Sequence, residues 1–332
     1  MIRRREFITL LGGAAAAWPL AARAQQGERV RRVGMLNGPL AESDPTAQTQ
    51  IAAFRDGLAK LGWVEGRNLR LDFRFGGGDG DRIRAYAAEL VQLAPDAIAT
   101  GSGAATRAVQ EHTHTIPIII AGAGDVVANG LITNIARPEA NITGVTNLFG
   151  SIGGKWVELL KEAVPTLNRV SFVNSQFALE GRVSGYRSSI EDASHALSVE
   201  MIDTQYRSAV QLVRAIDAFA AQPNGGLIVG AATTRADVRM ILELAAQYRL
   251  PTINADRGFA VNGGLIAYGG NVLYMWGRAP FFVDRILRGA KVSELPVEYP
   301  TKFEMVVNLK TAKALGLTVP HSLLVTADEI IE

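Results

Sequence analysis

RVGMLN at residues 32–37 and RVSFVN at residues 169–174 are the two stretches that decide the fold of this chain. Each is a short apolar run that begins at an arginine and ends at an asparagine, and the first leads into the turn Gly38-Pro39. Short apolar runs bounded by turn residues are typical of buried strands. The two stretches lie roughly 130 residues apart, which is too far for a solenoid repeat, so we interpret them as the first strands of two similar units.

Helical and strand-like segments alternate after each of these strands. In the first unit we expect strands at 32–37, 69–75, 96–100 and 116–121 and helices at 46–61, 81–93 and 104–111. In the second unit we expect strands at 169–174, 199–204, 226–230 and 251–254 and helices at 185–197, 209–221 and 235–248. Such alternation predicts parallel sheets covered by helices on both faces. The sequence therefore predicts an α/β fold of two doubly wound parallel-sheet lobes around a cleft.

The ends of these strands are the predicted ligand site, because open α/β sheets bind ligands at the carboxyl ends of their strands. Two lobes that face each other would work as a hinged clamp. The strand-end residues that we expect in the cleft are Asn37, Ser102, Asp125, Asn174, Thr233 and Asp256. We expect one lobe to comprise residues 30–147 plus 273–298 and the other to comprise residues 148–272 plus 299–332, with crossings near Asn147, Asn271 and Pro300.

The first 24 residues have the three parts of a secretory signal peptide. Arg3-Arg4-Arg5 precedes an apolar stretch at 8–22, and small residues at Ala22 and Ala24 indicate cleavage after Ala24. The stretch is too short for a membrane span, which needs about 20 apolar residues. Arg4-Arg5 before Glu6, Phe7 and Ile8 also resembles the twin-arginine consensus. We therefore expect an exported, periplasmic protein whose mature chain is not inserted in the membrane.

Charge and cysteine content exclude several classes of function. Residues 1–24 hold four arginines and one glutamate, a net +3, whereas the whole chain has +2, so the mature chain is about −1. Such a small charge gives no reason to expect a nucleic-acid or membrane-surface partner. The chain has no cysteine, which excludes disulfides, thiol chemistry and zinc–thiolate sites. Stability must come from the core that the long, 48% hydrophobic chain can bury.

Several sequence blocks resemble a known family. They are FRDGL at 54–58, LGWVEGRN at 61–68, IARP at 135–138, NITGV at 141–145, PTKFE at 300–304 and NLKTAKALGL at 308–317. In this order they resemble the ABC-transporter substrate-binding protein family that includes TrpX-like tryptophan- and tyrosine-binding proteins. The resemblance covers nearly the whole mature chain, from Val33 to Glu332.

The resemblance implies a type I periplasmic binding fold, in which a monomer captures a small molecule between two lobes without a cofactor. It also implies delivery of that molecule to an ABC permease powered by a separate ATPase. Two loops depart from the family pattern. The loop at 37–43 has fewer hydroxyls than usual, and the loop at 254–256 lacks the usual aromatic residues. Both departures point away from an aromatic ligand, and we expect an amino acid or a small carboxylate.

The segment GSGAAT at 101–106 follows a strand and opens a helix. Free backbone N–H groups and the helix dipole favour an anion at such a place, so Ser102, Gly103, Ala104 and Thr106 are candidates for binding a ligand carboxylate. The alternative is an ordinary turn in which Ser102 caps the helix.

The other candidates are aspartates, asparagines and a threonine near strand ends. Asp125 and Asp256 occupy matching places in the two units and could accept a ligand ammonium, or each could cap a following helix. Asn147 and Asn174 can both donate and accept hydrogen bonds, and turn formation is their alternative role. Thr233 follows the third strand of the second unit.

Neither a metal site nor an enzyme is predicted. The glycine-rich loop at 76–81 lacks the distal acid of a calcium loop, and His112 and His114 would point in different directions on a helix. Gly101-Ser102-Gly103 does not match a nucleophile elbow. Two alternatives stay open: an acid–base pair of Asp125 and Asp256 in a periplasmic enzyme, and a ligand-sensing protein that feeds a receptor.

Overall fold

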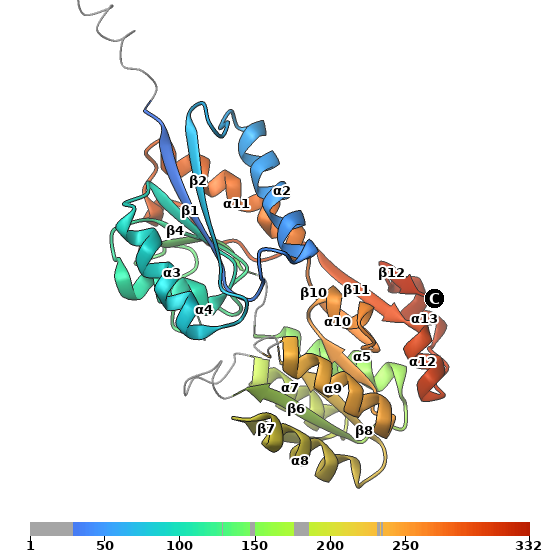
Figure 1. Cartoon of the computed structure of the whole chain (residues 1–332). Helices are drawn as coiled ribbons and strands as arrows, with labels where there is room; N and C mark the ends of the chain where they lie inside the picture. Colours follow the sequence, from blue (N-terminus) through green and yellow to red (C-terminus); the bar gives the residue numbers. More distant parts are fainter. Residues whose placement is uncertain (1–28, 128, 147–149, 176–185, 231–232, 234) are drawn as a thin grey trace, which may run out of the picture.

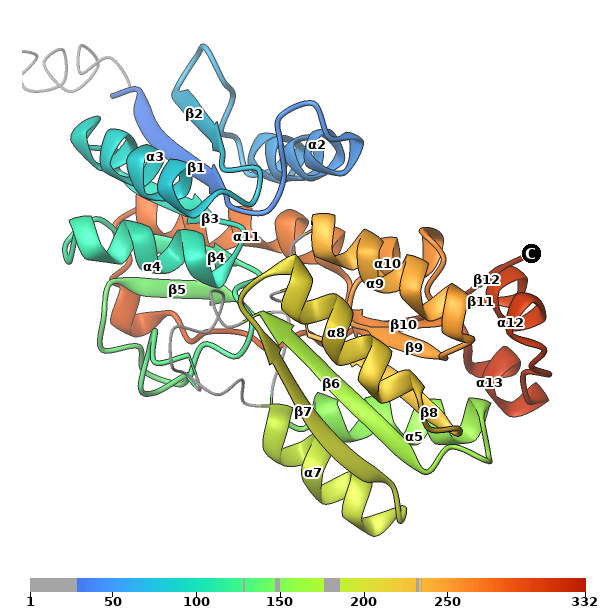
Figure 2. The same ribbon diagram turned by 60° about the horizontal axis from the view of Figure 1, so that its bottom comes forward.

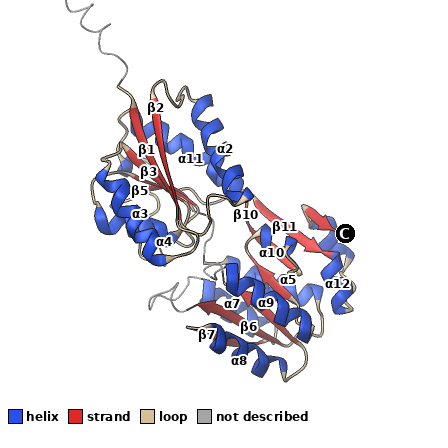
Figure 3. Cartoon of the chain, in the orientation of Figure 1, coloured by secondary structure: helices blue, strands red, loops and turns tan. Residues whose placement is uncertain are grey.

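The computed structural model describes residues 29–127, 129–146, 150–175, 186–230, 233 and 235–332. The chain forms two α/β lobes, each built on its own sheet (Figure 1). The strands lie inside each lobe and the helices cover them, which Figure 3 shows by colour. The predicted signal peptide at 1–24 and the candidate Asn147 lie outside the described residues.

The first sheet has the strand order β2-β1-β3-β4-β5 in the described chain, and every neighbouring pair is parallel. Its strands are β1 (Arg31–Asn37), β2 (Leu69–Phe75), β3 (Ala97–Thr100), β4 (Ile118–Ala121) and β5 (Ile142–Val145). Its helices are α2 (Pro45–Lys60), α3 (Gly80–Gln92), α4 (Gly103–His112) and α11 (Val272–Leu287), with the short 3₁₀ helix η1 (Val292–Glu294).

Alternate residues of these strands face opposite layers of helices. Met35 packs with α2 and α11, whereas its neighbour Leu36 packs with α3 and α4. This is the period-2 alternation of a strand buried on both faces. Both layers are apolar, so the first strand reads as one continuous apolar run.

The second sheet has the order β12-β11-β10-β9-β8-β6-β7 among the described residues. Its strands are β6 (Arg169–Ser175), β7 (Glu200–Tyr206), β8 (Gly225–Val229), β9 (Thr252–Asn254), β10 (Ile266–Gly270), β11 (Phe303–Asn308) and β12 (Glu329–Ile331). Its helices are α5 (Ile152–Ala163), α7 (Tyr186–Ala196), α8 (Ala209–Ala220), α9 (Arg235–Tyr248), α10 (Arg257–Val261), α12 (Leu309–Leu315) and α13 (His321–Thr326). Helices α5 and α7 share one core, and α8 and α9 share another on the opposite face (Figure 2).

One strand pair differs from the purely parallel sheets that the sequence predicts. Strands β10 and β11 are antiparallel, with Gly270 opposite Phe303. The physical reason is the route of the chain: after β10 it leaves to form α11 on the first lobe, and β11 then re-enters from the side where β10 left. The rest of the predicted alternation in both units is confirmed, with strand and helix ends within a few residues.

The chain passes between the lobes at three places in its described part: after β5, after β10 and before β11. Two of these segments are bonded to each other, because Thr146 N donates to Glu298 O at 2.9 Å. The third is tied to the return segment, because Asn271 N donates to Lys302 O at 3.5 Å. Such adjacent crossings are what a hinge needs. The lobe boundaries proposed from the sequence stay a prediction.

Candidate functional site

Asn37 ends β1, and its side chain is used inside the first lobe. It is 2% exposed. Its Nδ2 donates to Gln50 Oε1 at 2.7 Å, and its Oδ1 accepts from Leu40 N at 3.2 Å. The amide therefore fixes the loop after β1 to helix α2, and both of its polar ends already have partners.

The candidates at the start of α4 also have structural bonds. Ser102 caps the helix by accepting from Ala105 N at 3.2 Å, so the capping role is present. Thr106 is buried, and its hydroxyl lies 2.7 Å from Thr100 Oγ1 and donates to Ser102 O at 2.9 Å. Gly103 is half-buried and Ala104 is exposed at the helix start. The first-turn N–H groups of a helix have no partner within it, so this end can still receive an anion.

A close approach of loops requires glycine at Gly103. A Cβ at this position would lie 2.9 Å from Ala123 O, which belongs to the loop after β4. The loops after β3 and β4 are thus packed backbone against backbone. This packing brings the start of α4 beside the loop that carries Asp125.

Asp125 is half-buried after β4, near tyrosines from two different parts of the chain. Its Oδ1 accepts from Val127 N at 3.2 Å, the side-chain turn expected of such a residue. Burial and the charge of Asp125 raise the pKa of Tyr186, on α7 of the second lobe. The same two causes raise the pKa of Tyr299, in the segment that returns to the second lobe. Asp125 therefore lies where the two lobes meet.

In the second lobe, two strand-end candidates have buried polar atoms at the ends of β6 and β8. Asn174 is 2% exposed, and its Oδ1 fills the space where a side chain on Gly230 would be. Thr233 Oγ1 is buried beside the Tyr206 hydroxyl, without hydrogen-bond geometry to any group of the described residues. Because a buried polar group without a partner costs about 1–3 kcal/mol, such groups are expected at sites that bind something.

Beside Thr233 lies a tyrosine that is bonded to a carboxylate. Tyr206, at the end of β7, donates its hydroxyl to Asp237 Oδ2 at 3.0 Å. Burial and the Asp237 charge raise the pKa of Tyr206. This hydrogen bond holds the Tyr206 hydroxyl and the Asp237 carboxylate in place at the strand ends of the second lobe.

Asp256 takes its capping role in the structure. Its Oδ1 accepts from Gly258 N at 2.7 Å at the start of α10. Its own N–H donates to Asn254 Oδ1 at 2.8 Å, and Asn254 Nδ2 donates to Val229 O at 2.7 Å. This chain of bonds ties β8, β9 and α10 together, and it gives Asp256 a structural task.

Sequence reasoning did not select Tyr186, Tyr206, Asp237 or Tyr299. No local motif contains them, because each acquires its neighbours only when distant strands come together. The turn and cap residues were easier to find, since their partners lie two to four positions along the chain, as in Ser102 and Ala105.

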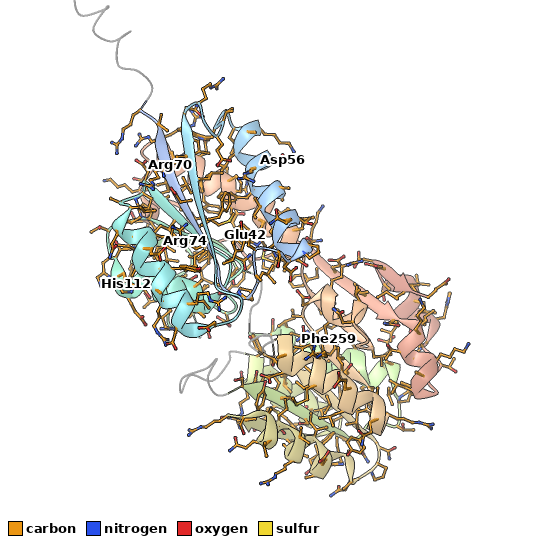
Figure 4. All side chains as sticks on the ribbon, viewed as in Figure 1. Glu42, Asp56, Arg70, Arg74, His112 and Phe259 are labelled. Carbon is orange, nitrogen blue, oxygen red and sulfur yellow. The ribbon has the colours of Figure 1, made fainter. Side chains whose placement is uncertain are left out.

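No cluster of three or more His, Asp or Glu residues able to hold a metal is found in the part of the chain that the structure describes. His112 lies on the outer flank of the first lobe, whereas Glu42, in the loop after β1, lies on the side toward the second lobe (Figure 4). In the same described part, no helix has the length and apolar character needed to span a membrane.

Comparison with known proteins identifies the family. The model of the ABC transporter substrate binding protein family matches residues 42–331. The chain belongs to this family. Members of the family are solute-binding proteins, which agrees with the resemblance in the sequence blocks.

The relatives of this substrate-binding protein are distant in sequence but similar in fold. The tyrosine-binding protein of Clostridioides difficile strain R20291 is 22% identical over 279 residues, covering 82% of this chain and 78% of the relative. The ABC domain of Streptococcus pneumoniae in complex with L-Trp has a TM-score of 0.80 at 20% identity, covering 91% of this chain and 99% of the other. A conserved domain protein of Vibrio cholerae has a TM-score of 0.78 at 21% identity, covering 91% and 100%. These structures establish the type I periplasmic binding fold.

Proposed function

We propose that this substrate-binding protein is the exported component of an ABC importer and captures an amino acid or small carboxylate between its lobes. The observation that carries the proposal is a pair of polar side chains at the second-lobe strand ends. Thr233 Oγ1 is buried beside the Tyr206 hydroxyl without hydrogen-bond geometry to any described group, and the Asn174 amide lies against Gly230, whose carbonyl accepts from Thr233 N. The relatives that bind tyrosine or contain L-Trp support an amino-acid ligand.

The proposed binding roles follow from charge. The start of α4, with Ser102, Gly103 and Ala104, receives the ligand carboxylate, because its N–H groups and dipole favour an anion. Asp125 accepts the ligand ammonium. From the second lobe, Asn174 and Thr233 supply further hydrogen bonds.

Three candidates act through support of the fold in this proposal. Asn37 and Thr106 hold the first-lobe loops through their internal bonds. Asp256 caps α10. They keep the site in place and do not contact the ligand. Asn147, near the crossing after β5, stays a proposed ligand-binding residue.

The lobes, 30–147 plus 273–298 and 148–272 plus 299–332, rotate about the crossings in this proposal. A ligand that touches both lobes stabilises the closed form only by its higher affinity for that form. Asn271 connects two of the crossing segments through its side chain. Its Oδ1 caps α11 by accepting from Tyr274 N at 2.8 Å, and its Nδ2 donates to Glu304 Oε2 on β11 at 3.2 Å. The hinge therefore couples a first-lobe helix to a second-lobe strand.

We propose export with cleavage after Ala24, a monomeric mature protein in the periplasm, and delivery of the ligand to a permease with its ATPase. The mature protein binds no nucleic acid and is not inserted in the membrane. It needs no cofactor and performs no catalysis.

A thermal-shift screen of the purified protein tests the binding proposal. Amino acids, small carboxylates, peptides and sugars are each added at a series of concentrations. A ligand that binds the native state raises the melting temperature, by a free energy of about 2.7 kcal/mol at 100 times its Kd. Recovery of the unchanged ligand supports a binding protein, whereas a converted product would establish an enzyme. A shift with sugars alone would contradict an amino acid or carboxylate ligand.

A further inference from the structure

One side-chain hydrogen bond joins the ends of β10 and β11, the two strands that lead into crossings between the lobes (Figure 1). Asn271 is the residue after β10, and Glu304 is the second residue of β11. Asn271 Nδ2 donates to Glu304 Oε2 at 3.2 Å, while Asn271 Oδ1 caps α11 of the first lobe. A single amide therefore connects a first-lobe helix to a carboxyl group of the second lobe.

Rotation of the lobes changes the surroundings of this carboxyl group. Glu304 is half-buried, and Asn271 at the start of α11 lies against it. The backbone beside the bond is the crossing itself, since Asn271 N donates to Lys302 O at 3.5 Å. When the lobes rotate about the crossings, α11 moves with the first lobe and Glu304 stays with the second. The exposure of the Glu304 carboxyl to water therefore differs between the two arrangements of the lobes.

The charged groups that act on Glu304 belong to the segments around α10 and β12. Arg257 is held by Glu329 in a two-point ion pair, with both N–O distances at 2.6 Å. Asp256 and Asp328 each accept a hydrogen bond from a backbone N–H. Within the part of the chain that the structure describes, Glu304 itself forms no ion pair. Three carboxylates and one engaged arginine thus surround it.

These surroundings favour the protonated form of Glu304. Burial raises the pKa of its carboxyl, the charge of Arg257 opposes the rise, and the three neighbouring carboxylates add to it. An ionised carboxylate is the better acceptor for the Asn271 amide, yet burial and the neighbouring charges outweigh that gain. In an arrangement that exposes the carboxyl, the pKa returns toward its ordinary value of about 4.3. The described arrangement is therefore favoured by proton binding and loses that advantage as pH rises through the raised pKa.

We propose that Asn271 and Glu304 form a proton-dependent latch of the hinge. With its proton bound, Glu304 accepts from Asn271 through its carbonyl oxygen, and the start of α11 stays against β11. Loss of the proton leaves a half-buried carboxylate among three others, and the lobes rotate to expose it to water. The inference rests on the proposed rotation of the lobes and adds its regulation. The proton on Glu304 sets the fraction of molecules in the described arrangement, and ligand affinity follows that fraction.

Distances between spin labels on the two lobes, measured without any ligand, test the latch. The chain has no cysteine, so Ala85→Cys on α3 and Ala218→Cys on α8 place one label at an exposed position on each lobe. With no other change, the distance distribution shifts once as pH rises from about 3 to about 8, with a midpoint above about 4.3. Each pKa unit by which the two arrangements differ changes their ratio tenfold. Glu304→Gln stays in the acid distribution at every pH, because its side chain remains uncharged.

Three further variants separate the latch from a general effect of acid. Asn271→Ser keeps a good cap for α11 but is too short to reach Glu304, so it stays in the high-pH distribution. Glu329→Gln releases Arg257 and removes one repelling charge, which lowers the midpoint by about 1 pH unit. Glu89→Gln, on α3 and outside these surroundings, is the matched control and leaves the transition unchanged. Melting temperatures at each pH show that the variants are folded.

The outcomes separate the latch from the proposed function. If the distances do not change with pH, or if Glu304→Gln or Asn271→Ser keeps the transition, the latch is wrong. The importer proposal then stands, because the thermal-shift screen tests it at neutral pH. A transition that depends on Glu304, in a protein for which the screen finds no ligand, supports the latch and contradicts the proposed function.

Discussion

The strand ends of the two lobes use the same residue types in opposite ways. In the first lobe, Thr106 has its hydroxyl bonded to Thr100 and Ser102, and Asn37 has both ends of its amide bonded. In the second lobe, Thr233 Oγ1 is buried without a partner among the described residues, and Asn174 packs against the bare backbone of Gly230. Among the described residues, the side chains of Asn37 and Thr106 in the first lobe are hydrogen-bonded, whereas those of Asn174 and Thr233 in the second lobe are not.

This difference is the basis on which we propose that the second-lobe strand ends bind the ligand. A satisfied buried polar group stabilises its own lobe, and an unsatisfied one lowers stability unless something binds to it. The identity of the residue does not distinguish the two cases, because asparagine and threonine occur in both. The two cases are distinguished only by the hydrogen-bond partners that surround each side chain.

The largest effect is expected from Asn37→Ala. The change removes two buried hydrogen bonds and leaves the Gln50 side chain and Leu40 N–H without partners, at a cost of about 2–4 kcal/mol in the free energy of unfolding. Thermal and urea unfolding of the ligand-free protein measure it. Ligand affinity at a temperature where the variant is folded stays close to wild type.

Asn174→Ala makes the same substitution near the end of β6, the corresponding strand of the second lobe. We expect a change of less than about 1 kcal/mol in the free energy of unfolding, because no hydrogen bond is lost, and a loss of affinity instead. If Asn174→Ala destabilises the protein as much as Asn37→Ala does, the contrast between the lobes is wrong.

Asp125→Asn sharpens the comparison at the point where the lobes meet. The amide keeps an oxygen that can accept from Val127 N but removes the charge, so an amine ligand should bind about 10- to 100-fold more weakly, the worth of a hydrogen bond to a charged group. Calorimetry with the ligand found in the screen measures this loss. As a control, Asp256→Asn keeps the cap of α10 and should leave affinity unchanged. Equal losses in both variants would place Asp256 in the site as well.

Thr106→Val and Thr233→Val apply one nearly isosteric change to both lobes. Thr106→Val should lower the free energy of unfolding by about 1–2 kcal/mol, because it leaves the buried Thr100 hydroxyl without its partner. Thr233→Val should leave stability unchanged or slightly higher, while ligand affinity falls. Unfolding curves measure the stability of both variants, and calorimetry on the same samples measures their ligand affinity. A loss of stability in Thr233→Val without any change in affinity would remove Thr233 from the site.

The smallest expected effect is a difference between the lobes in how pH changes the stability that one carboxyl group contributes. In the first lobe, the hydrogen bond from Arg32 lowers the pKa of Asp72, so its stabilisation is complete above the unfolded value of about 3.9 and is lost as pH falls through the folded pKa. In the second lobe, burial raises the pKa of Glu304, so its folded carboxyl holds its proton longer. Stability from Glu304 is present below the unfolded value of about 4.3 and is lost as pH rises through the folded pKa.

Melting temperatures between pH 2 and pH 7 measure these opposite slopes. Asp72→Asn should flatten the loss of stability below about pH 4, and Glu304→Gln should remove the loss that occurs as pH rises above about 4.3. Slopes of the same sign for both residues would contradict the assignment.

Much of the fold could be predicted from short segments. The bounds of β2 and α9 agree with the sequence pattern, and the other predicted elements are shifted by only a few residues. Strand β5, helix α5 and the elements after β9 were not predicted as such, because they fall outside the repeated alternation. The antiparallel pairing of β11 was missed for a related reason: it depends on the path of α11 through the other lobe.

The candidate site could be predicted only in part. The predicted placement at strand ends is confirmed for Asn37, Ser102 and Thr106, which all lie at the carboxyl edge of the first sheet, and their role in binding stays a prediction. Which of them are already bonded could not be read from the sequence. Gln50, the partner of Asn37, sits on a helix face that carries no motif.

The sequence by itself determined two α/β units and their polar strand ends, because hydrophobic periodicity and turn chemistry act over a few neighbouring residues. Tertiary structure alone decided which buried polar groups are hydrogen-bonded, and it joined the return segment at Glu298 to the end of β5 through Thr146 N. The physical reason is that a hydrogen bond depends on distance in space. Trp63 and Asp284, which are 221 positions apart in the chain, become hydrogen-bonded only after the elements between them have packed.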